Sequence, residues 1–307
     1  MFLRRSLKLA TGIASAAFAA TRTFALCDEK DVFKSRGDPY DGVSVSSASV
    51  AACESQAAFE ARLDRSLDEW KRGGRRGVWI QIPSTRPELI AAVLGRGFGF
   101  HHAEPSYLMV NKWLPGGESP LPANASHSVG VGVICVNSDD QILVVQEASG
   151  PAALRQSKTG TAFWKLPTGL VNQGEDLCAA AVRETREETG IDVDFVQLAS
   201  IRDGHKALHG KDNLFCVCIV KPRTSKIRVQ TSELADARWM PVDEFLALPY
   251  YAPATAYGEL NRAAIDCLRG RRGGLSGHSL PEKFRPGETR IYVGQPSGDG
   301  PSCASRL

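Results

Sequence analysis

The 307-residue sequence lacks a strong excess of charge of either sign. Its 37 lysines and arginines nearly balance its 34 aspartates and glutamates, which gives a net charge of +3. Dedicated nucleic-acid-binding proteins carry a strongly positive surface that attracts phosphate groups. We therefore expect no extended nucleic-acid surface, and an anionic substrate would be held by a metal ion and a few side chains.

The sequence also lacks the cysteine spacings of zinc sites. Its eight cysteines are scattered, and only Cys216 and Cys218 are near neighbours. Side chains two residues apart on a strand lie on the same face, which suits packing in a core. We interpret the cysteines as reduced thiols, most of them buried, in a compartment that does not form disulfides.

No acidic residue precedes Asp28, and the apolar segment of this region is too short to span a membrane. Residues 9–20 form an alanine-rich run of twelve residues, whereas a spanning helix needs about 20. The basic residues around it are Arg4, Arg5, Lys8 and Arg22. This composition predicts a presequence for an organelle, a mitochondrion or a plastid, with a secretory signal as the alternative and an uncleaved tail after that. Residues 1–50 are assigned to a targeting peptide and a disordered segment.

A dense acidic motif lies between Gly169 and Ile191. Within it Glu184, Glu187 and Glu188 follow the i, i+3, i+4 spacing that stacks side chains on one face of a helix. Like charges this close repel one another, so a positive partner is expected. Mg²⁺ and Mn²⁺ take oxygen ligands and commonly keep substrate phosphates in their shell. The motif therefore predicts metal-dependent phosphate chemistry.

The spacing of the motif resembles the Nudix box: Gly, five residues, Glu, seven residues, Arg-Glu, two residues, Glu-Glu, one residue, Gly and an apolar residue. The matching positions are Gly169, Glu175, Arg183, Glu184, Glu187, Glu188, Gly190 and Ile191. Thr185 departs from the pattern, because the family more often has an aliphatic residue there. The resemblance implies an α/β fold, the Nudix α/β/α sandwich with a mixed sheet, over residues 124–270.

The resemblance also implies roles for the residues of the box. The groups that would hold Mg²⁺ or Mn²⁺ are the carboxylates of Glu184, Glu187 and Glu188 and the backbone carbonyl of Gly169, while Glu175 would bind a further ion or water. Arg183 would orient these acids, and its side chain can reach Glu187 one turn further on. The ions would neutralise a diphosphate and make a water more acidic for attack on phosphorus.

Two residues outside the box are further candidates. Glu233, in VQTSELADARWM, occupies the region from which ADP-ribose-cleaving relatives supply a general base. The alternatives are a base from the box itself, or a Glu233 that only favours a nearby helix start. His205 would contact substrate, because it follows Arg202 where relatives carry Arg-Gln-Ser-His; Asp203 and Gly204 depart from that pattern.

The box also predicts local structure. Gly169 follows the apolar segment 163–166 and allows a sharp turn before the helix. Gly190 ends the helix where a left-handed cap favours glycine. The residues expected to face the core are Cys178, Val182, Thr185 and Thr189, with the glutamates pointing to solvent or a cleft.

Residues 55–118 predict a small α/β domain ahead of the box. An amphipathic helix is marked by the apolar stripe Phe59, Leu63, Leu67 and Trp70 and stops at Gly73 and Gly74. A strand at 78–82, a helix at 87–94 and a strand at 107–113 follow it. Adjacent side chains of one strand point to opposite faces, so we interpret His101, His102 and Glu104 as packing residues rather than a metal site.

The segments around this domain resemble a subfamily. These are GVWIQIP, GFGFHHAEPSYLMVNKWLP and PANASHSVGVG. They are similar to the amino-terminal extension of plant Nudix hydrolases acting on ADP-ribose and NADH, and of the animal Nudix protein encoded antisense to a fibroblast growth factor. The resemblance implies an acyltransferase-like fold that supports a homodimer.

The remaining chain completes the predicted catalytic domain and ends in a tail. The strands expected are 129–136, 142–146, 193–202 and 213–221, with helices at 243–247 and 259–268. Residues 271–307 are rich in Gly, Pro and Ser and predict irregular structure, except for a short apolar strand at 291–293.

The sequence thus predicts metal-dependent hydrolysis of a nucleoside diphosphate linked to another moiety. The expected substrate is a nucleotide-sugar or dinucleotide, ADP-ribose or NADH, with release of AMP and, from NADH, of NMNH. Other Nudix substrates, namely coenzyme A, oxidised nucleotides, capped RNA or dinucleoside polyphosphates, are the alternative. A non-catalytic binding module is less well supported, because such modules usually lose acids of the box and all are present here.

Overall fold

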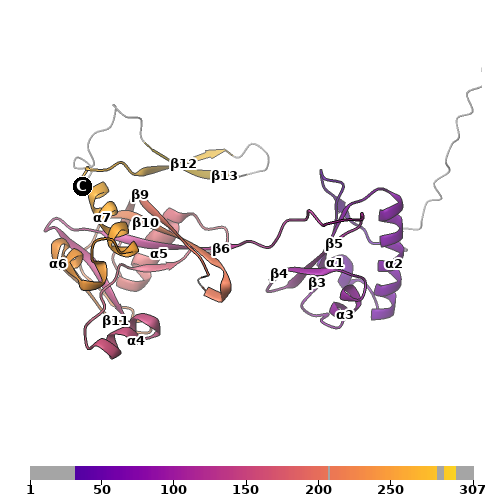
Figure 1. Ribbon diagram of the computed structural model, residues 1–307, viewed down its shortest axis with the longest axis horizontal. Helices are drawn as coiled ribbons and strands as arrows, with labels where there is room; N and C mark the ends of the chain where they lie inside the picture. The colour runs from indigo at the N-terminus through magenta and orange to yellow at the C-terminus, as the bar shows by residue number, and fades with distance from the viewer. Residues whose placement is uncertain (1–31, 207, 282–286, 295–307) are drawn as a thin grey trace, which may run out of the picture. The chain divides into compact units, whose positions relative to one another are not determined.

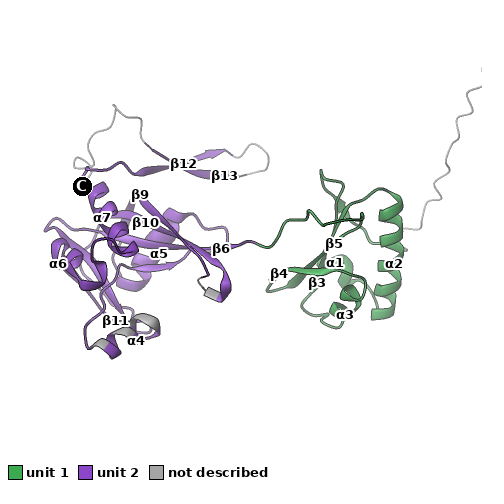
Figure 2. Ribbon diagram, viewed as in Figure 1, with its two compact units in different colours: residues 1–124 green, residues 125–307 purple. Residues whose placement is uncertain are grey.

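The computed structural model describes residues 32–206, 208–281 and 287–294. The chain divides into two compact units, residues 1–124 and 125–307 (Figure 2). The basic, alanine-rich segment from which a targeting function was predicted lies outside the described residues.

Unit 1 contains a five-stranded sheet in the order β1-β2-β3-β5-β4. Figure 1 labels its strands β3, β4 and β5 and its three helices. Its strands are β1 (Arg36–Gly37), β2 (Val43–Val45), β3 (Gly77–Pro83), β4 (Gly99–Glu104) and β5 (Tyr107–Trp113), and its helices are α1 (Ser47–Ala51), α2 (Gln56–Arg72) and α3 (Leu89–Leu94). Only the β2–β3 pair is parallel. This unit is the small α/β domain that the sequence predicts.

Helix α2 forms as its apolar stripe predicts. The Ser55 hydroxyl accepts a hydrogen bond from the Ala58 backbone N–H at 3.1 Å, which satisfies one donor of the first turn. Phe59, Leu63 and Trp70 are buried at the spacing of one helix face. The helix ends at Gly73, as expected.

Unit 1 begins earlier than the sequence predicts, because residues 32–50 are folded rather than disordered. Phe33, Val43 and Val45 are buried, and the Phe33 N–H donates to the Ser66 hydroxyl at 2.8 Å. Val43 and Val45 lie on β2, which has only three residues and is too short to show an alternating pattern, and Phe33 lies outside any strand.

The two adjacent histidines of β4 contact each other, which corrects the expectation that they face opposite sides. A β-bulge shifts the register between Phe100 and His102, so the regular alternation is interrupted. The two Nδ1 atoms are 2.6 Å apart, and the His101 ring packs edge-on against Trp79. Packing and hydrogen bonding thus remain the interpretation of this pair.

Unit 2 contains a six-stranded mixed sheet in the order β13-β12-β9-β10-β6-β8 and a separate pair, β11-β7. The strands are β6 (His127–Cys135), β7 (Gln141–Glu147), β8 (Thr168–Leu170), β9 (Val193–Gly204), β10 (Asp212–Pro222), β11 (Leu234–Pro241), β12 (Leu275–Pro281) and β13 (Glu288–Gly294). The helices are α4 (Gly150–Thr159), α5 (Leu177–Thr189), α6 (Val242–Ala247) and α7 (Ala256–Leu268), with 3-10 turns η1 (Leu208–Gly210) and η2 (Pro249–Tyr251).

Helices cover both faces of the mixed sheet, as an α/β/α sandwich requires. Strand β10 runs parallel to β6 and antiparallel to β9. On one face of β10, Cys216 and Cys218 pack with Ala180 and Ala181 of α5. On the opposite face, Val217 and Ile219 pack in a cluster with residues of α6 and α7. The predicted fold class is confirmed, and the two cysteines share one face as the sequence indicates.

Six cysteines lie in the described ranges, and all six are free thiols: Cys53, Cys135, Cys178, Cys216, Cys218 and Cys267. All but Cys178 are buried. Cys27 and Cys303 lie outside those ranges.

The tail forms a hairpin where the sequence predicts mostly irregular chain. Strand β12 pairs with β13 over seven residues, and Leu275 pairs with Leu198 of β9. The predicted strand at 291–293 is thus the middle of β13, which lies at the edge of the sheet. The sequence does not predict β12 because this segment contains glycine and proline, which are depleted in strands.

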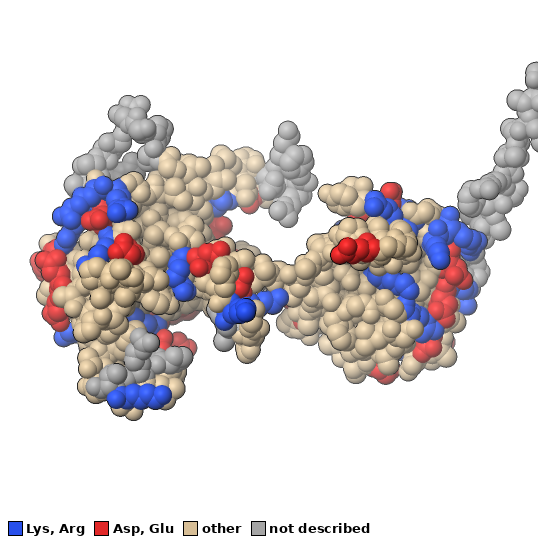
Figure 3. All heavy atoms as spheres, in the orientation of Figure 1, with Lys and Arg blue, Asp and Glu red and all other residues tan. Residues whose placement is uncertain are grey.

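The structure also shows how charged side chains are distributed on one face and how long and apolar the helices are. On the face shown in Figure 3, basic and acidic side chains are intermixed rather than gathered into one basic surface. No helix in the described part of the chain is both long and apolar enough to cross a membrane.

Gly190 offers a test of the helix end. Its φ is +68°, and an added Cβ would lie 3.0 Å from the Cβ of Arg228. Gly190→Ala should therefore lower the free energy of unfolding of unit 2 by about 1–2 kcal/mol. Gly273→Ala is the control, since a Cβ there meets nothing within 4 Å. Urea unfolding followed by tryptophan fluorescence measures both; equal stability of the two variants would contradict the assignment.

Candidate active site

The acidic motif forms a loop and a helix on one face of the sheet. Strand β8 pairs with β6, with Gly169 opposite Val131. The chain then turns and enters α5, which is anchored by the fully buried Ala180 and Ala181. Gly190 ends the helix in the left-handed conformation, and its N–H donates to the Arg186 carbonyl at 2.8 Å. The predicted cap role of Gly190 is confirmed, whereas Gly169 lies within β8 and not at a sharp turn.

Gly169 must lack a side chain because the Glu184 carboxyl group occupies the space. A Cβ built on Gly169 would overlap the carboxyl carbon and both oxygens of Glu184. The backbone of β8 and the carboxylate of α5 therefore pack in direct contact. This places the peptide group of residue 169 next to one of the predicted metal ligands.

Arg183 is the centre of the acidic cluster. Its guanidinium donates to both carboxylate oxygens of Glu175 at 2.7 and 2.8 Å, to Glu184 at 2.7 Å and to Glu187 at 3.1 Å. It also donates to the backbone carbonyl of Leu170 at 3.0 Å. One side chain thus joins three acids to the loop before the helix, and the predicted bridge to Glu187 is one of several contacts.

The carboxyl groups of the cluster differ in proton affinity. Hydrogen bonds from Arg183 lower the pKa of Glu175 to about 2, so this group is ionised at neutral pH. Burial raises the pKa of Glu184, against the opposing effect of Arg183.

Glu188 is buried, which corrects the expectation that all the glutamates point away from the core. Only 6% of its surface is exposed, and its Oε2 accepts from the Thr168 N–H at 3.2 Å. Burial raises its pKa to about 7, although the nearby Lys165 acts in the opposite direction. The buried face of α5 consists of Ala180, Ala181, Thr185, Glu188 and Thr189. Thr185 and Thr189 are there as predicted, while Cys178 and Val182 are only partly buried.

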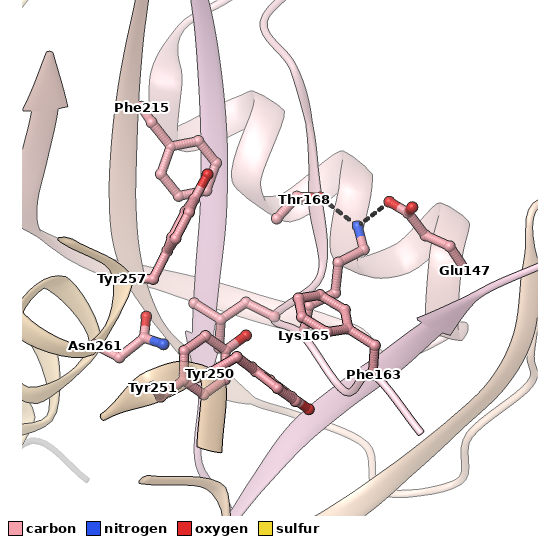
Figure 4. A pocket seen from close by; sticks show the side chains of 10 residues that line it. Glu147, Phe163, Lys165, Thr168, Phe215, Tyr250, Tyr251, Tyr257 and Asn261 are labelled. Carbon is pink, nitrogen blue, oxygen red and sulfur yellow. Dashed lines mark hydrogen bonds and ion pairs between the residues drawn. The ribbon is translucent and has the colours of Figure 1, made fainter. Parts of the chain in front are cut away.

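Lys165 is a functional candidate that sequence reasoning missed. Its Nζ lies 2.8 Å from Glu147 Oε1 and 2.6 Å from Thr168 Oγ1 (Figure 4). Only 14% of its side chain is exposed. The sequence signal for this role is the position of Lys165 between two apolar residues, Trp164 and Leu166, both of which are buried. A lysine in such a segment needs a partner, because lysines are almost never buried without one.

A pocket of about 410 Å³ adjoins these residues (Figure 4). Its lining is largely aromatic: Phe163, Phe215, Tyr250, Tyr251 and Tyr257 surround it together with Glu147, Lys165, Leu166, Thr168 and Asn261. The Phe163 and Tyr250 rings are 4.2 Å apart. The pocket therefore combines flat apolar walls with a cation and a hydroxyl at one side, a combination suited to an aromatic base joined to phosphate.

The aromatic walls come from segments far apart in the sequence. Phe215 belongs to β10, Tyr250 and Tyr251 to η2, and Tyr257 to α7. A Cβ on Gly132 would overlap the Phe215 ring, so this glycine lets the ring lie against β6. No local motif could have brought these residues together before the fold was known.

Glu233 precedes strand β11 and not a helix, so the alternative that it only favours a nearby helix start is wrong. Its backbone carbonyl accepts from Ala148 N–H at 2.9 Å at the start of β11, and its side chain is exposed. The Gln230 N–H in the same loop donates to the Glu188 carbonyl at 3.1 Å. The loop that carries Glu233 is thereby attached to the last turn of α5.

His205 lies at the β9–β10 turn and does not line the pocket. Its side chain is 71% exposed, and its Nδ1 is 3.3 Å from Asp212 Oδ2. Nothing in its contacts distinguishes it as a substrate ligand.

The donor set of the cluster fits a hard divalent cation. It offers carboxylates on α5 and its preceding loop, and a backbone that approaches Glu184 closely only because residue 169 is glycine. Within the described ranges no three acidic, histidine or cysteine side chains are already grouped as a metal site. The Arg183 guanidinium holds three of the acids instead, so we expect them to reorient around an ion.

Comparison with known proteins agrees with this geometry. Residues 33–114 match a family described as Nudix hydrolase domain, and residues 126–258 match the NUDIX domain. Nudix hydrolase 2 of Arabidopsis thaliana is 39% identical over 236 residues, which cover 77% of this chain and 82% of the relative. Nucleoside diphosphate-linked moiety X motif 6 of Homo sapiens is 34% identical over 262 residues, 84% of this chain and 78% of the relative.

Solved structures similar to this chain have low sequence identity. A NUDIX hydrolase from Nitrosomonas europaea has 22% identity and a TM-score of 0.35, covering 44% of this chain and 86% of that one. The NUDIX domain of Shewanella oneidensis NrtR, complexed with ADP ribose, has 17% identity and a TM-score of 0.37, covering 49% and 94%.

The raised pKa of Glu188 predicts a pH-dependent stability in metal-free protein. Its pKa is about 7 in the folded state against an ordinary value of 4.5, so folding favours the protonated form. This contribution is present at acid pH and is lost as the pH rises through about 7. Glu188→Gln should match wild type near pH 5 and exceed its free energy of unfolding by about 2–3 kcal/mol near pH 8. Urea unfolding in chelator across this range tests the sign; a difference that does not grow with pH would refute it.

Proposed function

The chain belongs to the Nudix hydrolase family, and from this we propose that unit 2 hydrolyses a nucleoside diphosphate linked to another moiety, ADP-ribose or NADH, with release of AMP. The observation that carries the proposal is the aromatic pocket beside the acidic helix. Thr168 connects the two, because it lines the pocket and its N–H donates a hydrogen bond to Glu188 of the helix. A base in the pocket would therefore have its diphosphate next to the carboxylates.

The residues of the box supply the metal ligands in this proposal. Glu184, Glu187 and Glu188 and the Gly169 carbonyl would hold Mg²⁺ or Mn²⁺, with Glu175 near a further ion or water. When bound, such an ion neutralises diphosphate charge and makes a coordinated water more acidic. Arg183 keeps the acids close together before that, since four of its hydrogen bonds go to their carboxylates and offset their mutual repulsion.

Lys165 and the aromatic rings orient the substrate. Lys165 Nζ is a buried cation that can hold a phosphate oxygen in place of Glu147. Phe163 and Tyr250 offer ring faces on which an adenine or nicotinamide ring stacks. The orienting groups and the reacting diphosphate are thereby held in one geometry, which is a major source of rate acceleration.

Two sources of the general base fit the arrangement. A carboxylate of the box is one of them. The other is Glu233, whose exposed side chain lies on the loop that bonds the last turn of α5. If Glu233 is the base, Glu233→Gln will lower kcat with little change in KM. If Glu233 has no catalytic role, the variant will leave both constants unchanged.

The metal-dependent activity is tested with purified protein, Mg²⁺ or Mn²⁺ and ADP-ribose or NADH. AMP should be released, and chelator should abolish its release. Glu187→Gln should lower kcat/KM by about 100-fold or more with the fold intact, because it removes one ligand charge. Glu118→Gln, an exposed acid outside the box, is the matched control. Full activity of Glu187→Gln would remove Glu187 from the metal site.

The same assay separates the alternative substrates. Coenzyme A, an oxidised nucleoside triphosphate, capped RNA and a dinucleoside polyphosphate are offered under identical conditions. Preference for one of these would replace ADP-ribose and NADH while retaining the reaction class. Binding of nucleotides without cleavage of any would identify a non-catalytic module.

Phe163 tests the stacking role of the pocket. Phe163→Leu should raise KM for ADP-ribose by about tenfold and leave kcat nearly unchanged, because base stacking is worth roughly 1–3 kcal/mol. Phe100→Leu, at a ring that is 61% exposed in unit 1, is the control. Equal KM values for the two variants would place the base elsewhere.

A further inference from the structure

The helix that carries the metal ligands begins without the usual cap. Asp176 occupies the N-cap position of α5 with an extended backbone, but its side chain accepts no hydrogen bond from the first turn. An aspartate at this position normally accepts from an N–H of that turn. The donors at the start of α5 therefore need another partner.

The tail hairpin supplies that partner. The Tyr292 hydroxyl of β13 accepts a hydrogen bond from the Cys178 backbone N–H at 3.2 Å. Arg290, two residues earlier on the same strand, donates from Nε to Asp176 Oδ2 at 3.2 Å. Residues 114 positions away in sequence thus satisfy the cap residue and a first-turn donor.

The packing around Tyr292 indicates that the hairpin is shaped for this contact. Gly277 of β12 pairs directly with Tyr292, and a Cβ on it would approach the Tyr292 ring at 3.1 Å and the Arg290 guanidinium at 3.5 Å. The Tyr292 ring also meets Phe195 edge-on, with centroids 6.2 Å apart. A side chain at residue 277 would therefore force the Tyr292 ring to shift, and it would touch the Arg290 guanidinium.

The hairpin contact is adjacent to the metal ligands along the chain. Glu175 directly precedes Asp176, and its carboxylate is held by Arg183, five residues beyond Cys178. Movement at the start of α5 would shift the loop that carries Glu175 relative to the helix that carries Arg183. The position of one metal-binding acid thus depends on how firmly the first turn is fixed.

We propose that Tyr292 and Arg290 are positioning residues for the metal site, and that the tail hairpin acts as the N-terminal cap of the catalytic helix. The inference rests on the proposed function, in which the acids of this helix and its preceding loop bind a divalent ion. Neither residue touches the substrate or the ion; each acts through the backbone around Asp176 and Cys178.

The test uses the full chain and two single variants. Tyr292→Phe removes only the hydroxyl that accepts from Cys178, and Arg290→Gln removes the charge that pairs with Asp176. Tyr40→Phe, at a tyrosine that is 80% exposed, and Arg271→Gln, at a surface arginine paired with Asp266, are the controls. Arg290→Lys retains the charge and should restore part of any loss.

Two readouts that do not require turnover are compared. Mn²⁺ affinity, measured from the electron paramagnetic resonance signal of the free ion, should fall by about three- to tenfold in Tyr292→Phe and Arg290→Gln. Amide hydrogen exchange in peptides covering residues 172–183 should accelerate by a similar factor, while exchange in α7 stays unchanged. Both controls should behave as wild type.

The outcomes separate this inference from the proposed function. The inference is overturned if amide exchange at residues 172–183 is as slow in both variants as in wild type. It is also overturned if their Mn²⁺ affinity stays within about twofold of the wild-type value. If wild type binds Mn²⁺ but cleaves no substrate, the function fails and the comparison still stands. If wild type binds no Mn²⁺, the proposed function and the metal-positioning role both fail, and the exchange data test only the capping of α5 by the hairpin. If the Arg290 variant unfolds, Asp176→Asn removes the same Arg290–Asp176 ion pair by changing the acidic partner.

Discussion

The site depends on a single guanidinium placed among carboxylates. Arg183 contacts Glu175, Glu184 and Glu187 and also the Leu170 carbonyl, so it ties the loop before α5 to the face of the helix. Without it the acids would repel one another, and the loop would lose the side-chain hydrogen bonds that join it to the helix. The glycine at 169 follows from the same constraint, because Glu184 can reach this cation only where the facing backbone carries no side chain.

Around this centre, one short helix and its leading loop create two opposite environments for carboxyl groups. Arg183 keeps Glu175 ionised, whereas burial raises the pKa of Glu188 towards neutrality. The difference comes from which side of the chain each residue faces, one toward a cation and one toward the sheet. A bound divalent ion would favour ionisation of Glu188, so ion binding and proton release are linked at this residue.

The sequence predicts the parts of this site that lie close together along the chain. The Gly169–Ile191 spacing indicates the helix, its end at Gly190 and the acids, because helical periodicity places residues within a turn of one another. It does not predict the burial of Glu188, which arises from packing against β8, nor the aromatic pocket, whose walls come from β10, η2 and α7. The β12–β13 hairpin is predicted only in part, as a strand at 291–293, because β12 contains glycine and proline and because the contacts of the hairpin with α5 are 114 residues away in sequence.

The charges around the pocket explain why ion and substrate would bind together. Among the described side chains, Glu147 and Glu188 lie near Lys165, and Glu175, Glu184 and Glu187 pair with Arg183, so five carboxylates face these two cations. Lys165 is already engaged by Glu147 and Thr168, so a diphosphate that competes for it would add negative charge to a site that has too much. An added cation would offset this charge, and in the proposed site it would lie beside Glu188, whose Oε2 accepts from the Thr168 N–H. The pocket and the acidic helix therefore form one site, joined at the short segment from Lys165 to Gly169.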